Sequence, residues 1–212
     1  MGWANASYLE AVRSHIGGGF RTGKNALRYL REDGELSGEA RSALRRYSTS
    51  SAPAVEDGKL LNRALRSGGD THREWAEALD GAFVWSFEQD VVLWRGGRFD
   101  QDEASCFVST SLVERSARKF ASRAGGELTA ILLPAGSPVA VPAGVWASGD
   151  DARTLTVVGR EVEIILPRGT VFDDGVRLHP FAAHPQRGHV SFAFREAVAP
   201  APSPPGATPV KP

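Results

Sequence analysis

Two glutamates separated by a single residue are the first candidates for chemistry in this sequence. Glu161 and Glu163 lie in "GREVEIILPRGT", directly before an apolar run that is typical of a buried strand. Residues i and i+2 of a strand project to one face about 7 Å apart, so we expect both carboxylates to point into one space. Paired carboxylates at this range suit a reaction at an anomeric carbon, where positive charge develops. A solvated strand end that carries two charges is the alternative interpretation.

A cationic side chain ends a second apolar run, "VVLWRGG". Arg95 at the end of a buried strand can hold a phosphate through two hydrogen bonds, and Gly96 lets a ligand approach the backbone closely. An ion pair at the edge of the core, with one of the glutamates as partner, is the alternative role for Arg95.

Three hydroxyl side chains lie where "FVSTSLVERSARKF" passes from a strand pattern into a helical one. Ser111 followed by Glu114 matches a capping box, which predicts a structural role for Ser111 at the start of the helix. Ser109 and Thr110 have no comparable local explanation, so both are candidates for the site.

The stretch "GGFRTGKN" nearly matches a phosphate-binding loop from Gly18 to Lys24. The motif then requires a serine or threonine hydroxyl for magnesium, and Asn25 lacks one. The preceding residues have a helical pattern, whereas such a loop follows a buried strand. We therefore interpret these glycines as a helix break.

The elements that must position these residues follow from hydrophobic periodicity. Four segments in the first eighty residues have helical spacing: 7–16, 24–33, 58–67 and 72–79. From about Phe83 the chain turns to short strand-like runs, interrupted by a helical pattern at 112–123; the runs are 91–95, 105–111, 128–134, 137–143, 154–158, 161–167, 170–172 and 189–198. Helices that precede strands without alternation predict an α+β fold and disfavour a doubly wound parallel sheet.

Composition narrows the function classes. Lys plus Arg and Asp plus Glu number 25 each, so the formal net charge is zero, which disfavours a chain built to coat nucleic acid or an anionic membrane. The single cysteine, Cys106, excludes an internal disulfide, and the five histidines show no metal-ligand spacing. No apolar stretch approaches the roughly 20 residues that span a bilayer, and no standard signal peptide is visible.

In chain order, "LWRG", "FVSTSL" and "EVEIILPRGT" resemble the Arg–Ser–Glu signature of ADP-ribosyltransferases, among them clostridial-type toxins and arginine-specific mono-ADP-ribosyltransferases. Upstream, "ALRRYSTSS" and "LLNRALR" are similar to a helical region of the toxins, so the resemblance spans residues 43–172. Each motif alone is weak, whereas three in the right order are specific.

The resemblance implies an ADP-ribosyltransferase fold, with two packed, mainly antiparallel sheets, an N-terminal helical region and NAD in the cleft between the sheets. We expect one domain over residues 1–198, with a helical part at 1–80 and a β-rich NAD-binding core at 81–198. The Pro- and Ala-rich end, 199–212, is expected to be a disordered tail.

The resemblance also implies contacts with NAD. Arg95 would grip the phosphates, and Gly96 would recognise the nicotinamide amide through its backbone. Thr110 would line the nicotinamide side. Asn62 and Arg66, one helical turn apart, match residues that contact NAD phosphate in the toxins.

Catalytic roles follow from the same resemblance. Ser109 would hold Glu163 in position, and Glu163 would bind the 2′-hydroxyl of the nicotinamide ribose. That bond strengthens as positive charge grows on the sugar, so it acts in the transition state. Glu161 would orient the acceptor and help to remove its proton. No metal is implied.

Glutamate at the first position of the pair favours arginine as the acceptor, because a guanidinium needs a carboxylate to orient and deprotonate it. The sequence thus predicts a mono-ADP-ribosyltransferase that modifies arginine on a target protein, as a bacterial toxin or effector module or a phage enzyme. Modification of nucleic acid or of another side chain, hydrolysis of NAD, and a non-enzymatic NAD-binding module are the alternatives.

Some residues depart from the family pattern. The spacing from Tyr47 and Ser48 to Asn62 is longer than in typical toxins, so neither is assigned a contact with NAD. Trp146 is the nearest aromatic that could grip a substrate protein, with a partly buried surface tryptophan as the alternative. Arg123 is a candidate second phosphate ligand.

If the chain is a toxin, its producer needs protection, so a cognate immunity protein is an expected partner besides the target protein. Nucleic acid is not expected as a partner, nor is a membrane span. The location expected is that of a secreted effector acting in a target-cell cytosol, or else the cytoplasm.

Overall fold

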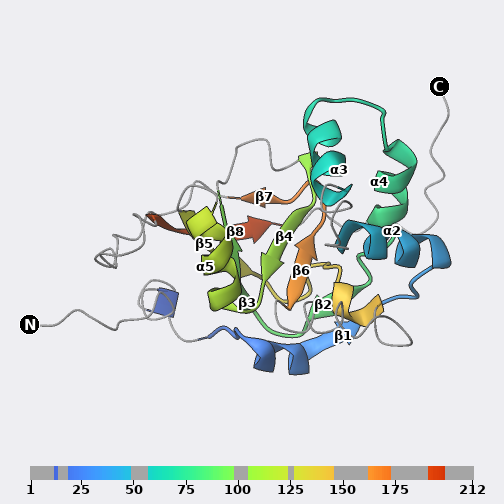
Figure 1. The fold of residues 1–212 in the computed structure, drawn as a ribbon. Helices are drawn as coiled ribbons and strands as arrows, with labels where there is room; N and C mark the ends of the chain where they lie inside the picture. The colour runs from blue at the N-terminus through green and yellow to red at the C-terminus, as the bar shows by residue number, and fades with distance from the viewer. Residues whose placement is uncertain are drawn as a thin grey trace, which may run out of the picture.

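The computed structural model describes residues 12–13, 19–48, 57–97, 105–123, 127–145, 162–172 and 191–198. Its helices are η1 (Lys24–Tyr29) and η4 (Pro142–Val145), which are of the 3-10 type, and α2 (Gly38–Ser48), α3 (Asp57–Arg66), α4 (Arg73–Asp80) and α5 (Glu114–Arg123) (Figure 1). Its strands are β1 (Leu30–Glu32), β2 (Trp85–Phe87), β3 (Val91–Gly96), β4 (Val108–Ser111), β5 (Glu127–Leu133), β6 (Glu163–Leu166), β7 (Val171–Phe172) and β8 (Ser191–Val198). No helix in these residues is long and apolar enough to cross a bilayer.

The strands form a six-stranded sheet of order β6-β4-β3-β5-β8-β7 and a two-stranded sheet of β1 and β2. All pairs are antiparallel except β5 with β8. Two isolated bridges, Trp85 with Val139 and Ala140 with Ile165, connect the small sheet to the large one. The expected α+β fold with mainly antiparallel sheets is confirmed.

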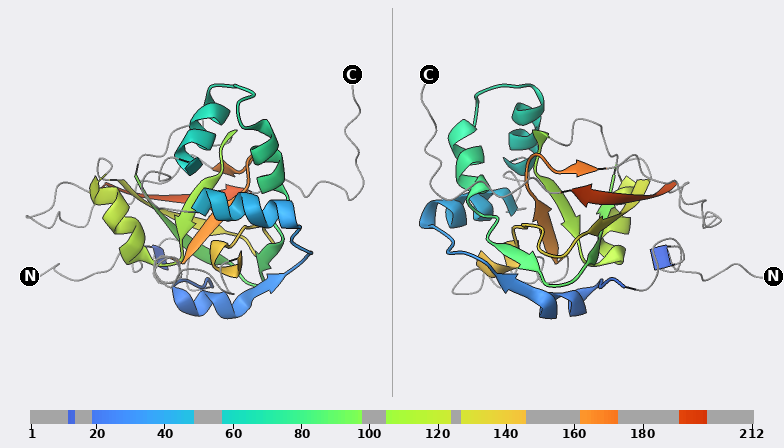
Figure 2. Two further views of the ribbon diagram at one scale, coloured as in Figure 1. Left: turned by 45° about the vertical axis from the view of Figure 1, so that its right-hand side comes forward. Right: turned by 180° about the vertical axis from the view of Figure 1, so that it is seen from behind.

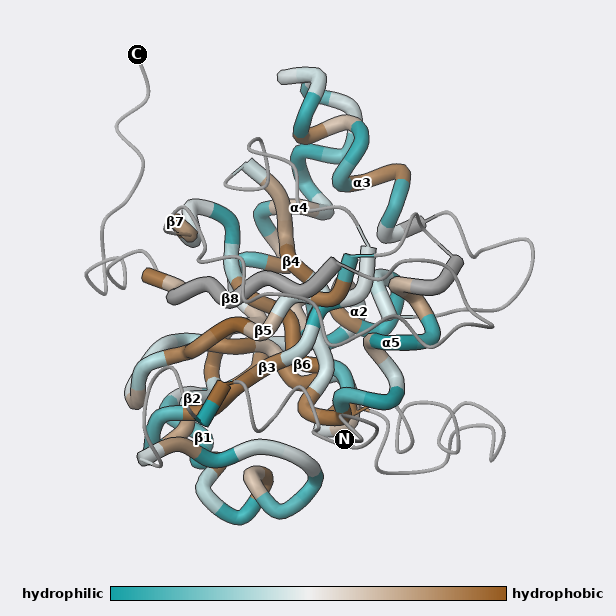
Figure 3. The backbone as a smooth tube through the Cα atoms, turned by 90° about the vertical axis from the view of Figure 1, so that its left-hand side faces the viewer, coloured by the Kyte–Doolittle hydropathy of each residue, from teal (hydrophilic) through white to brown (hydrophobic). Residues whose placement is uncertain are grey.

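The first four residues of strand β3, "VVLW", are all apolar, and the strand is buried on both sides over this stretch. Val91 and Leu93 belong to the larger core, which α2 and α4 cover. Val92 and Trp94 belong to a second core, under α5. Figures 1 and 2 show α2, α3 and α4 gathered on one side of the sheet and α5 on the other. Figure 3 shows the hydrophobic colour concentrated in the central strands.

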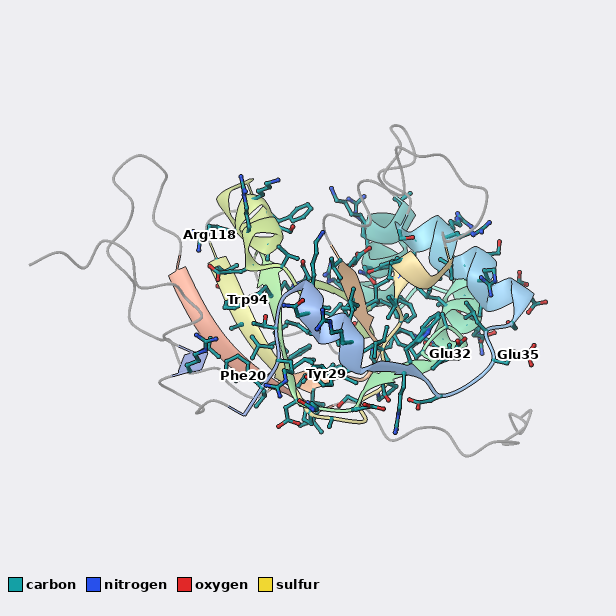
Figure 4. The ribbon with its side chains drawn as sticks, turned by 90° about the horizontal axis from the view of Figure 1, so that it is seen from below. Phe20, Tyr29, Glu32, Glu35, Trp94 and Arg118 are labelled. Carbon is teal, nitrogen blue, oxygen red and sulfur yellow. The ribbon has the colours of Figure 1, made fainter. Side chains whose placement is uncertain are left out.

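The segment 24–33 was expected to be a helix throughout, and this expectation is wrong for its second half. It contains the short helix η1 and then the strand β1, which pairs with β2. Just before it, Arg21 bridges to Val91 at the start of β3, and the Trp94 indole donates to the Thr22 hydroxyl at 3.1 Å. The pairing of β1 with β2 thus satisfies backbone N–H and C=O groups of both strands. Helical periodicity does not reveal this pairing, because it depends on a distant part of the chain. Figure 4 labels Tyr29 and Glu32 in this segment and Phe20 before it.

Of the other expected helices and strands, some are confirmed and some are not. The helices expected at 58–67, 72–79 and 112–123 are confirmed as α3, α4 and α5, whereas α2 was not expected from periodicity. Residues 137–143 form two isolated bridges and the start of η4 instead of a strand, and Pro138 and Pro142 explain this because proline has no backbone N–H for a ladder. The segment 154–158, and 7–16 apart from residues 12–13, lie outside the described residues.

Candidate active site

Three adjacent strands bring Arg95, Ser109 and Glu163 together. The strands β3, β4 and β6 are neighbours, and Trp94, Ser111 and Glu163 form one row across them. Arg95 follows Trp94, and Ser109 precedes Ser111 by two residues, so all three predicted residues lie within two positions of this row. The Arg95 Nη1 atom donates to the carbonyl oxygen of Ser109 at 3.0 Å. The strand order therefore places a cation, a hydroxyl and a carboxylate in one neighbourhood.

The hydroxyl of Tyr47, from α2, lies 3.3 Å from Ser109 Oγ. Burial raises the pKa of the Tyr47 phenol to about 12, and the Glu163 carboxylate acts in the same direction. Hydrogen bonds with Ser109 and Asn62 and the Arg95 charge oppose this rise in the pKa. The charges of Arg95 and Glu163 thus both act on this phenol, in opposite directions.

Asn62, on α3, binds the backbone of Phe107 at both of its polar groups. Its Nδ2 donates to the Phe107 carbonyl at 2.9 Å, and the Phe107 N–H donates to Oδ1 at 3.1 Å. The same Nδ2 donates to the Tyr47 hydroxyl at 3.1 Å. Both amide hydrogens thus have partners within the protein, so a bond to NAD phosphate requires an exchange of one of them. Arg66 lies exposed in the last turn of α3.

Gly96 and Thr110 each have a structural role of their own. A Cβ on Gly96 would lie 1.8 Å from the Ala117 carbonyl oxygen, so only glycine lets α5 pack this closely on β3. The Thr110 side chain is buried, and its hydroxyl donates to the Ile164 carbonyl at 2.6 Å. These contacts join α5 to β3 and β4 to β6, and the predicted contacts of the two residues with nicotinamide stay predictions.

The extended geometry expected between the two glutamates is not found. Strand β6 begins at Glu163, and Val162 has a φ of +44°, which is left-handed rather than extended. The backbone turns here because the Val162 carbonyl accepts the Leu112 N–H at 3.2 Å while its side chain is buried. The strand argument that put both carboxylates on one face therefore fails at Val162, and Glu161 itself lies outside the described residues.

The capping box expected from Ser111 and Glu114 is wrong in detail. Ser111 Oγ accepts the N–H of Val113 at 2.9 Å, one residue before α5 begins. Glu114 pairs with Arg118 one helical turn later. Ser111 is structural as expected, but it stabilises the turn into the helix rather than the N–H of the third helical residue.

Tyr47 is the site residue that sequence reasoning left without a role. Its signal was present, because Ala40, Ala43, Leu44 and Tyr47 are the buried residues of α2 and follow helical spacing. That stripe places the Tyr47 ring in the core at the last turn of α2, and its hydroxyl then reaches β4. The neighbouring Ser48 hydroxyl bonds back to the Leu44 carbonyl at 2.9 Å.

The remaining candidates are only partly placed. Trp146 lies outside the described residues, and Arg123 is the last residue of α5. No group of three or more His, Cys, Asp or Glu that could hold a metal ion occurs in the described part of the chain.

Sequence comparisons do not identify relatives: no protein-family model matches the chain, and a comparison with curated proteins finds no match. Solved structures do match. The structure of C3stau2 from S. aureus with NAD superposes with a TM-score of 0.55 at 16% identity, over 92% of this chain and 98% of that one.

Two further solved structures match the fold of this chain. Plx2a, an ADP-ribosyltransferase toxin from Paenibacillus larvae, gives a TM-score of 0.53 at 15% identity, covering 77% of this chain and 88% of that one. An ADP-ribosyltransferase from Clostridium botulinum gives a TM-score of 0.51 at 15% identity, covering 84% of this chain and 97% of that one. At such identities the likeness concerns the fold, and the chain has the ADP-ribosyltransferase fold that the three motifs predicted.

Proposed function

We propose that the protein is a mono-ADP-ribosyltransferase that transfers ADP-ribose from NAD to an arginine of a target protein, as a toxin or effector module. The observation that carries the proposal is the convergence of Arg95, Ser109 and Glu163 from three adjacent strands around the Tyr47 hydroxyl. The ADP-ribosyltransferase fold supports it.

The side chains at this point fit the chemistry of NAD. Its diphosphate is anionic, which suits Arg95: the guanidinium has five N–H donors, and the side chain is only half-buried at the end of β3. The nicotinamide ring is cationic and its ribose carries hydroxyl groups, which suits the half-buried carboxylate of Glu163.

In the proposed reaction Glu163 binds the 2′-hydroxyl of the nicotinamide ribose. As the bond to nicotinamide lengthens, positive charge grows on the sugar, and a carboxylate fixed in advance stabilises that charge more than it stabilises the ground state. Arg95 anchors the phosphates and so holds the ribose in place. Glu161 orients the incoming guanidinium and accepts its proton. The arginine acceptor rests on the glutamate at this first position.

The test is mass spectrometry of a cell lysate incubated with the purified protein and NAD. We expect a gain of one ADP-ribosyl group on arginine, reduced at least about 100-fold by Glu163→Ala and lost with Glu161→Gln. Glu39→Gln, which changes an exposed carboxylate at the start of α2, is the matched control and should retain activity.

The other outcomes are distinct. NAD consumption that survives Glu161→Gln, with no modified protein, would identify a glycohydrolase. Modification of another side chain or of nucleic acid would overturn the arginine assignment alone. If NAD stays intact under all conditions, the proposed activity is wrong and a binding module replaces it.

A further inference from the structure

We infer that Tyr47 is a positioning residue, which directs the hydroxyl proton of Ser109 toward Glu163 through a hydrogen-bond chain that starts at Asn62. The inference rests on the proposed function for its catalytic meaning. The direction of the hydrogen-bond chain depends only on contacts among the described residues.

The direction of the chain is set at Asn62. The Phe107 backbone N–H can only donate, and it points to the Asn62 Oδ1 atom at 3.1 Å. The amide is therefore oriented with Nδ2 as the donor toward the Phe107 carbonyl and toward the Tyr47 oxygen. Tyr47 thus accepts one hydrogen bond and retains a single proton of its own to donate.

That proton has two acceptors within reach, Ser109 Oγ and the Phe107 carbonyl oxygen, both at 3.3 Å. The carbonyl already accepts a shorter bond from Asn62 at 2.9 Å, which favours Ser109 as the acceptor. A tyrosine with its ordinary pKa of about 10 keeps its proton at neutral pH, and burial raises the pKa of Tyr47 further, to about 12.

A Ser109 hydroxyl that accepts from Tyr47 must send its own proton elsewhere. In the register of β4 and β6, Ser109 lies opposite Ile165 and Ser111 lies opposite Glu163. Ser109 and Glu163 are therefore diagonal neighbours on one face, about 7–8 Å apart at Cα, within reach of a glutamate side chain. The Glu163 carboxylate is an anionic acceptor near this hydroxyl, and its charge also acts on Tyr47.

Packing alone does not require the hydroxyl. The Tyr47 ring packs edge-on against Phe107 with centroids 6.0 Å apart, a contact that phenylalanine would also make. A buried hydroxyl without partners costs free energy, so the Tyr47 hydroxyl contributes only through the hydrogen bonds that it makes.

Kinetics of NAD cleavage test the catalytic part. Tyr47→Phe should lower kcat about 10- to 100-fold with KM for NAD changed less than about twofold, because Ser109 and Glu163 lose their alignment in the transition state. Ser109→Ala should have a similar effect, and the double variant should be no worse than Ser109→Ala, since both act in one chain. Tyr29→Phe, which changes the tyrosine that lies under Arg21, is the matched control.

A second measurement does not depend on activity. A hydrogen bond donated to a carboxylate lowers its pKa, so an NMR titration of labelled Glu163 should show a higher midpoint in Tyr47→Phe than in the wild type or in Tyr29→Phe. An unchanged midpoint, or additive kinetic losses in the double variant, would overturn the inference. If the wild type cleaves no NAD, the proposed function fails, while the titration still decides whether Tyr47 directs Ser109.

Discussion

At the scale of single residues, the site contains a conformation that is unusual for its residue type. Val162 is β-branched, yet its φ is +44°, in the left-handed region. The residue is buried, with 3% of its surface exposed. Such a conformation costs about 1–3 kcal/mol and persists only where the surroundings hold it. Here the holding contacts are the buried side chain and the bond from Leu112. The backbone therefore turns directly before Glu163, and this turn determines where β6 begins.

The raised pKa of Tyr47 predicts a loss of stability at high pH. An unfolded tyrosine titrates near pH 10, whereas Tyr47 in the folded chain titrates at about 12. Between these values the folded state keeps a proton that the unfolded state has released, so the stability falls by up to about 3 kcal/mol as the pH rises. Urea denaturation measures the difference in free energy of unfolding between the wild type and Tyr47→Phe. This difference should favour the wild type less at about pH 11.5 than at about pH 9. A constant difference would contradict the prediction.

At the scale of elements, the close packing of α5 on β3 depends on a single glycine, Gly96. A strand buried on both sides needs a partner on each, and α5 is the partner that covers Val92 and Trp94. The helix reaches the end of β3 only because Gly96 has no side chain. The same packing holds the strand whose last residues include Arg95, so the position of the predicted phosphate ligand depends on this contact.

Gly96→Ala should therefore destabilise the fold. The added methyl group would meet backbone atoms of α5, the Ala117 carbonyl oxygen at 1.8 Å and the Ala121 nitrogen at 2.5 Å, which cannot rotate away. We expect a loss of about 3 kcal/mol in the free energy of unfolding, measured by urea denaturation. Gly19→Ala, where a Cβ would meet nothing within 4 Å, is the control and should change stability by less than about 0.5 kcal/mol. Equal stability of the two variants would show that α5 can shift.

At the scale of the whole molecule, helices and sheet are tied together across long stretches of sequence. Arg168, in the turn after β6, pairs with Asp80 at the end of α4 and lies over the Phe107 ring. Arg45 of α2 donates to the Val145 carbonyl in η4 at 3.1 and 2.8 Å. Tyr47 and Asn62 contact the backbone carbonyl of Phe107, the residue before β4. The site is thus built where the helical part and the sheet join.

If the whole molecule acts as a toxin, its activity should show in living cells. We expect that the wild-type chain stops growth when it is expressed in bacteria without a protective partner, and that Glu163→Ala restores growth. Colony counts after induction measure this effect, with protein levels checked by immunoblot. Equal growth with both versions would contradict toxicity in that host, and rescue of the wild type by a co-expressed neighbouring open reading frame would identify the immunity protein.

Local pattern determined a large part of this protein. Apolar spacing predicted α3, α4 and α5, and β-rich runs predicted β3, β4, β5, β6, β7 and β8, because amphipathic and fully apolar segments bury themselves in ways that short windows of sequence reveal. The order of the three motifs predicted the ADP-ribosyltransferase fold, which the structural comparison confirms.

Tertiary structure alone decided the rest. Residues 30–32 leave the helical pattern and form β1 because β2 offers them a partner, and Val162 turns because Leu112 binds its carbonyl. Tyr47 joins the site because the last turn of α2 packs beside β4, where its hydroxyl meets Ser109, 62 residues further along the chain. Strand partners, backbone turns and buried hydroxyl contacts depend on groups distant in the chain, so no local window of the sequence contains them.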